Sequence, residues 1–138
     1  MAPLAALVLM LAAFSADDEM AWIEAVPTLD WTPVTASENS YFLSRPANPA
    51  KVMGMTRMWV RVEANPGQSK ERLSLSIIAL YEFDCLGGKA RRLQSTFYKA
   101  SNMTGESTTL REPTPWDYST PGTLGDDVFR SACGLGED

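Results

Sequence analysis

The stretch that decides the fold is "LSLSIIALYEFDCLGGKARRLQSTFY", residues 73–98. Its first half is a long apolar run in which alternate side chains share one face, as they do in a β-strand. The adjacent glycines of "LGGK" (86–89) supply the positive φ that a tight hairpin turn needs. The run "ARRLQSTFYKA" (90–100) then returns beside the first. We predict a central strand over 73–85 that places Cys85 on the core face.

Further strands are expected before this hairpin. "TRMWVRVEA" (56–64) alternates apolar and polar residues and indicates a half-buried strand. Shorter β-favouring pieces occur at 31–34 and 41–43. The prolines Pro46 and Pro49 are expected to force a loop after them, because proline has no N–H to donate to a sheet.

The C-terminal part adds an edge strand and a helix. A polar run near 106–111 is typical of a sheet edge. The period then changes, with Thr123 and Asp126 forming a weak capping box before a helix and Gly134 ending it. An apolar stripe lies at helical spacing: Leu124, Val128, Phe129, Ala132 and Cys133. The sequence thus predicts an α+β fold, a mostly antiparallel sheet of about six strands with a C-terminal helix packed on it.

The two cysteines, Cys85 and Cys133, have three possible roles. A zinc site needs about four ligands, and this chain has no histidine and no C-x-x-C motif. A nucleophilic cysteine needs a neighbouring base, usually histidine. Elimination favours a disulfide, and the predicted core faces of the central strand and the helix bring the two residues together. We therefore expect one disulfide, no metal and no cofactor.

Composition limits the class of protein. The 138 residues fit one domain, and a hydrophobic content of 45% is enough for a core. A net charge of −5 argues against nucleic acid as a partner, since such binding depends on clustered lysine and arginine.

The N-terminus has the composition of an export signal. Its apolar run suits a signal peptide and is too short to span a bilayer, although no lysine or arginine precedes it. A buried helix is the alternative. We predict a signal peptide over 1–16, a linker over 17–28, a domain over 29–134 and a tail over 135–138. The mature protein is then exported, periplasmic or associated with the cell surface, with no membrane span.

The second face of the sheet is the candidate interaction surface. Alternation places four large side chains there: Trp59, Ile78, Leu80 and Tyr98. Arg57 and Arg61 flank Trp59 on its own strand, an arrangement that suits a polar rim around an aromatic anchor. The alternative is that the N-terminal segment around Trp31 and Tyr41 covers these residues as a minor core.

An enzyme would need an acid–base pair, for which Glu82 and Asp84 are the best candidates. Paired carboxylates perform glycosidase-type chemistry when they flank a cleft. Carboxylates two residues apart on a strand are more often solvated or paired with arginines, such as Arg61 and Arg92 here. We therefore expect no catalytic residues and keep a carboxylate-dependent hydrolase as the less favoured alternative.

Several motifs occur in a fixed order with a glycine turn among them: "WVRVE" (59–63), "YEFDC" (81–85), Arg91, "TFY" (96–98), "PTPWDYSTPGT" (113–123) and "SAC" (131–133). Together they resemble the surface-adhesin protein E domain family of Gram-negative bacteria, over about residues 29–134. The resemblance implies a C-terminal helix tied by a disulfide to an antiparallel sheet, a tendency to form homodimers, and binding to host matrix and serum glycoproteins. It favours an exported, non-enzymatic module that acts through protein contacts; a structural envelope protein without a soluble ligand is the alternative.

Overall fold

A computed structural model describes residues 19–68 and 72–136 of the chain. The predicted signal peptide, residues 1–16, lies outside the described residues. Within the described part, no helix is both long enough and apolar enough to cross a membrane.

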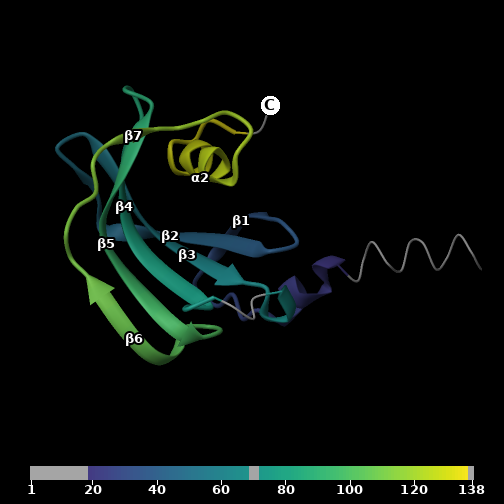
Figure 1. Cartoon of the computed structure of the whole chain (residues 1–138). Coiled ribbons are helices and arrows are strands. Elements are labelled where there is room, and N and C mark those ends of the chain that lie inside the picture. The colour runs from purple at the N-terminus through teal and green to yellow at the C-terminus, as the bar shows by residue number, and fades with distance from the viewer. Residues whose placement is uncertain (1–18, 69–71, 137–138) are drawn as a thin grey trace, which may run out of the picture.

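The fold is an antiparallel sheet that curves around a C-terminal α-helix, as Figure 1 shows. Its strands are β1 (Thr32–Ala36), β2 (Ser40–Val52), β3 (Met55–Ala64), β4 (Ser76–Asp84), β5 (Lys89–Ala100), β6 (Thr104–Leu110) and β7 (Asp117–Tyr118). The helices are the short 3₁₀ elements η1 (Ala21–Ala25) and η2 (Pro66–Gln68), and α2 (Leu124–Ala132). Strands β1 to β6 lie side by side in chain order, and β7 pairs with the start of β5. The predicted fold class is confirmed.

The central hairpin forms as its sequence predicts. The backbone N–H of Gly88 donates to the carbonyl of Asp84 at 2.9 Å, and Gly88 has a φ of 73°. The Asp84 carboxylate accepts a further hydrogen bond from the N–H of Gly87 at 2.8 Å. The turn is therefore held by backbone and side chain together, which fixes the register of β4 against β5.

The central strand is shorter than predicted. Strand β4 begins at Ser76 rather than at residue 73, and Leu73 is 94% exposed. The hydroxyl of Ser74 donates to the carbonyl oxygens of Ser76 and Tyr98, at 3.0 and 2.7 Å. The Ser74 side chain therefore competes for carbonyl groups that would otherwise serve the hydrogen-bond ladder of the sheet. The apolar alternation in the sequence consequently extends further than the strand itself.

The expected loop at the prolines is wrong, because β2 continues through both Pro46 and Pro49. Strand β1 pairs with β2 only as far as Ser44, so the outer side of β2 has no β1 partner beyond that point. Proline fits such an edge because no neighbour needs its missing N–H. The pairing with β3 shifts register between Pro46 and Lys51.

Helix α2 covers one face of the sheet, which we call the helix face. Its first turn is capped as predicted, with Thr123 Oγ1 accepting from the N–H of Asp126 at 3.1 Å. The core beneath it contains the buried residues Val60, Phe83, Val128 and Phe129. Cys85 and Cys133 form the predicted disulfide, which ties the end of the helix to the sheet next to this core.

Candidate functional site: the face opposite the helix

The face of β3, β4 and β5 that points away from α2 carries the predicted interaction residues, and we call it the opposite face. Trp59 lies directly across from Leu80, and Ile78 lies directly across from Thr96. Tyr98 is two residues beyond Thr96, which makes it a diagonal neighbour of Ile78. All four predicted residues are half-buried. The register therefore joins them in one band, named here the Trp59 band, across three strands.

The N-terminal segment, residues 19–31, packs beside this band. Trp22 meets Tyr41 edge to face, with ring centroids 6.3 Å apart. The guanidinium of Arg45 lies 4.9 Å from the Trp31 ring, and that of Arg61 lies 5.8 Å from it. These contacts cover the β2 side of the opposite face, where a minor core was the alternative prediction.

Arg61 differs from its predicted place at a rim, because it is 1% exposed. Its Nε donates to Glu63 Oε2 at 2.8 Å, and its Nη1 donates to the carbonyl oxygen of Pro27 at 2.9 Å. A charged pair leaves water at a large desolvation cost unless hydrogen bonds satisfy it. The buried Arg61 side chain therefore links the N-terminal segment, through Pro27, to strand β3.

Glu63 extends this buried network to the turn between β5 and β6. Its carboxylate also accepts from the Ser76 hydroxyl and from the backbone N–H of Asn102. The side-chain oxygen of Asn102 in turn accepts from Arg61 Nη2 at 3.3 Å. Sequence reasoning missed this network, although a charged pair two residues apart within an apolar strand was a usable signal.

Glu82 forms a second ion-pair cluster at the hairpin end of the opposite face. It is 4% exposed, and its two oxygens receive hydrogen bonds from Arg57 at 2.9 Å and from Arg91 at 2.8 Å. Burial alone would raise the pKa of this carboxyl, but the hydrogen bonds and charges of Arg91 and Arg57 outweigh it and hold the pKa below its ordinary value.

The predicted arginine partners of Glu82, Arg61 and Arg92, are wrong. The register places Arg57 and Arg91 directly across from Glu82 on its two neighbouring strands. Arg92 is paired with Tyr81 instead, and therefore belongs to the helix face. A shift of one residue in the pairing of two strands moves a side chain to the other face of the sheet. The alternation of apolar and polar residues predicts neither the register of two strands nor the position of a bulge.

The carboxylates considered for hydrolysis are both engaged. Glu82 binds two arginines, and a lowered pKa is the opposite of what a general acid requires. Asp84 accepts from Gly87 within the hairpin turn. The part of the chain that the structure describes also contains no group of three or more histidine, cysteine, aspartate or glutamate side chains placed to hold a metal ion.

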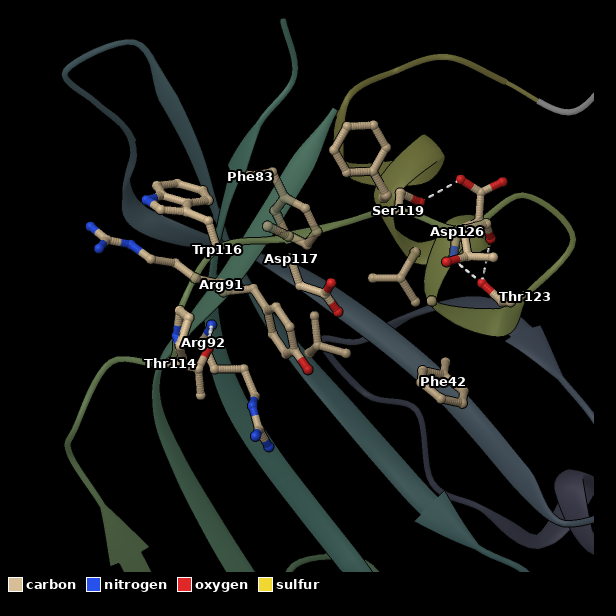
Figure 2. A pocket seen from close by; sticks show the side chains of 18 residues that line it. Phe42, Phe83, Arg91, Arg92, Thr114, Trp116, Asp117, Ser119, Thr123 and Asp126 are labelled. Atoms are coloured by element: carbon tan, nitrogen blue, oxygen red, sulfur yellow. Dashed lines mark hydrogen bonds between the residues drawn. The ribbon is translucent and has the colours of Figure 1, made fainter. Parts of the chain in front are cut away.

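Trp116 borders the Glu82 cluster. The Arg91 guanidinium lies 4.6 Å from the centroid of the Trp116 ring, and Lys89 Nζ lies 5.4 Å from it. Figure 2 shows the Arg91 side chain extending away from α2, with Trp116 beside it. One end of the opposite face thus combines exposed cationic edges with an aromatic ring, a composition common at protein interfaces.

These features define a class: a small α+β domain in which a disulfide ties a C-terminal helix to an antiparallel sheet. The family model for surface-adhesin protein E matches residues 31–134, so the chain belongs to the surface-adhesin protein E family. This membership identifies an adhesin-like surface protein with an exported or cell-surface location. No curated protein and no solved structure gives a significant match.

Proposed function

We propose that this protein is a non-enzymatic binding module of the cell envelope and that the Trp59 band is its protein-binding surface. The observation that carries the proposal is the adjacency of Trp59, Leu80, Ile78 and Tyr98 on the face that α2 leaves uncovered. A sheet face that meets only water is normally polar, whereas apolar patches usually mark partner or subunit contacts.

The surroundings of the band support the same function. Arg57 and Arg91 remain about one-third exposed while they bind Glu82, so each presents a cationic edge beside the apolar residues. Tryptophan and arginine are the residues that most often dominate binding energy at interfaces. The partner is either a second copy of this chain or another protein, and family membership favours a protein ligand at the cell surface.

Export belongs to the same proposal. The apolar N-terminus and the disulfide both fit an oxidising compartment outside the cytoplasm. N-terminal sequencing of protein recovered from the cell envelope should find a chain that begins after residue 15 or 16. Recovery from the cytoplasm of protein that still carries Met1 would contradict export.

The binding surface is tested with the double substitution Trp59→Thr and Leu80→Thr, which keeps strand-forming residues while removing most of the apolar area. The matched control is Leu73→Thr with Leu110→Thr, since both leucines are exposed and lie outside the band. Sedimentation velocity measures self-association, and crosslinked pull-down from intact cells measures other partners.

The expected result is loss of association in the Trp59 and Leu80 variant, with a melting temperature close to that of the control variant. Unchanged association together with a collapsed melting temperature would show that these residues serve as core, and the proposed surface would be wrong.

A further inference from the structure

A cavity of about 670 Å³ lies on the helix face, on the other side of the sheet from the Trp59 band. Its walls are α2, the adjoining strands and the segment 114–120, which leads from β6 towards the helix (Figure 2). Small-molecule sites typically have volumes of about 300–1,000 Å³. The cavity is therefore large enough for a ligand, and none of the four residues of the Trp59 band lines it.

The inner wall of the cavity is apolar and aromatic. It is formed by side chains that also belong to the core or pack against it: Phe42, Val60, Phe83, Val128 and Phe129. Phe83 and Phe129 meet at a centroid distance of 6.0 Å. This wall offers a preformed surface for the apolar part of a ligand.

Two opposite charges stand at the strand side of the cavity. Asp117 lies directly across from Ala90, and Arg92 is two residues further along the same face of β5. Such diagonal neighbours have Cα atoms about 7–8 Å apart. Figure 2 shows the Asp117 carboxylate directed into the space between the sheet and α2.

Neither charge is neutralised by the protein. The side chains of Arg92 and Asp117 form no hydrogen bond or ion pair with any residue in the ranges 19–68 and 72–136. The other charged groups that line the cavity are engaged, since Arg91 binds Glu82 and Asp126 accepts from the hydroxyl of Ser119. The cavity thus presents one free cation and one free anion beside an apolar wall.

Tyr81 adds a neutral polar group next to the cation. It lies directly across from Arg92 in the register of β4 and β5, and it also lines the cavity. Burial raises the pKa of the Tyr81 phenol, and the charge of Arg92 offsets this only in part. The hydroxyl therefore stays protonated at neutral pH and is a hydrogen-bond donor.

We propose that this cavity binds a small zwitterion with an apolar body, the chemistry of a hydrophobic amino acid. The ligand carboxylate binds the Arg92 guanidinium and the Tyr81 hydroxyl, and its ammonium group binds Asp117. Its side chain occupies the wall formed by Phe83 and Phe129. Charge-assisted hydrogen bonds of this kind are the stronger ones in proteins and give orientation as well as affinity.

The test is isothermal titration of the full-length protein with L-phenylalanine, compared with phenylacetate and phenethylamine, which each lack one of the two charges. The zwitterion should bind more tightly than either single-charge compound. Arg92→Gln and Asp117→Asn should each weaken its binding about tenfold or more, as expected for loss of a hydrogen bond to a charged group. Arg111→Gln and Glu112→Gln, exposed positions outside the cavity, are the matched controls and should leave binding unchanged.

Amide and indole chemical shifts locate the ligand independently of affinity. Gly125 and Trp116 line the cavity and should shift on titration, whereas Gly54, which is in the β2–β3 turn and does not line the cavity, should not. Thermal melts establish that each variant is folded, and Tyr81→Phe replaces Arg92→Gln if the latter is not. Absence of binding at millimolar L-phenylalanine, or equal binding of phenylacetate with an unaffected Asp117→Asn variant, would overturn the proposal.

Discussion

Arg61 and Glu63 form an ion pair within a single strand, with Arg61 Nε donating to Glu63 Oε2 at 2.8 Å. Their side chains are 2% and 1% exposed. Residues two apart on a strand share a face, so the pair lies side by side on the opposite face under the N-terminal segment. Three further elements contribute hydrogen bonds to it: the segment through Pro27, β4 through Ser76 and the β5–β6 turn through Asn102.

Removing one member of this pair is predicted to destabilise the fold strongly. Glu63→Leu should lower the free energy of unfolding by about 3–5 kcal/mol, because it leaves the buried Arg61 charge without its counter-ion. Replacing both residues, with Arg61→Met and Glu63→Leu together, should cost clearly less than the single change. Urea denaturation of the three proteins measures both differences.

An exposed ion pair is the matched control for that series. Lys99 and Glu106 lie 3.2 Å apart with side chains that are 70% and 82% exposed. Glu106→Leu should change the free energy of unfolding by less than about 1 kcal/mol, because water screens such a pair. A similar cost for Glu63→Leu and Glu106→Leu would show that the buried network does not stabilise the fold.

The disulfide is predicted to be a major stabilising element. Cys85 and Cys133 are 48 residues apart, and a cross-link over such a loop stabilises by about 4 kcal/mol on the loop-entropy account. The variant with Cys85→Ala and Cys133→Ala should show this loss in urea denaturation, and a reductant should affect only the wild-type protein. Intact-mass analysis should find the native protein lighter by two hydrogens than its reduced form; two titratable thiols in the purified protein would contradict the bond.

The stability contributed by Glu82 is predicted to disappear in acid. Its folded-state pKa lies below the ordinary value of 4.5, so the folded state binds the proton less readily than the unfolded state. The contribution is therefore present above about pH 4.5 and is lost as the pH falls through the folded-state pKa. Urea denaturation at several pH values should show wild type more stable than Glu82→Gln at pH 7, with the difference shrinking below pH 4.5. A difference that grows on acidification would contradict this.

The cap of α2 is predicted to contribute about 1 kcal/mol. Thr123→Ala removes the acceptor for the Asp126 N–H and should lower the free energy of unfolding by that amount. Thr123→Ser keeps the acceptor and should restore most of the stability. Thr120→Ala is the control within the same segment, because no side-chain hydrogen bond of Thr120 exists among the described residues. Equal stability of the Ala and Ser variants at position 123 would refute the cap.

The sequence predicted the elements that follow from the local spacing of apolar residues, and it predicted the disulfide by excluding other roles for the cysteines. Alternation identified β3, β4 and β5, the capping pattern identified α2, and the absence of histidine directed Cys85 and Cys133 to a disulfide. Prediction from the sequence failed where contacts with a neighbouring segment determine the bounds of a strand. Pro46 lies within β2 because β1 has already ended, and Leu73 lies outside β4 although the apolar alternation includes it.

The same distinction holds for the candidate site. Parity placed Trp59 and Leu80 on one face, but their direct adjacency depends on the register of β3 against β4. The register of β4 against β3 and β5 likewise determines that Arg57 and Arg91 are the partners of Glu82. The burial of Arg61 depends on a segment distant in sequence that folds back over the sheet, and the cavity depends on where the chain after β6 crosses towards α2. No periodicity in the sequence encodes these long-range contacts.

The order of the strands has a consequence for how the chain reaches its native state. Because β1 to β6 are neighbours both in sequence and in the sheet, each strand can pair as soon as it follows the one before, and loop-closure entropy stays low. The chain after β6 must return across the sheet: β7 pairs with the start of β5, and α2 then packs on the helix face with Cys133 at its end. The sheet can therefore assemble before α2 is in place, whereas the bond between Cys85 and Cys133 can form only after α2 has docked on the sheet, so oxidation of this pair reports that helix and sheet have come together.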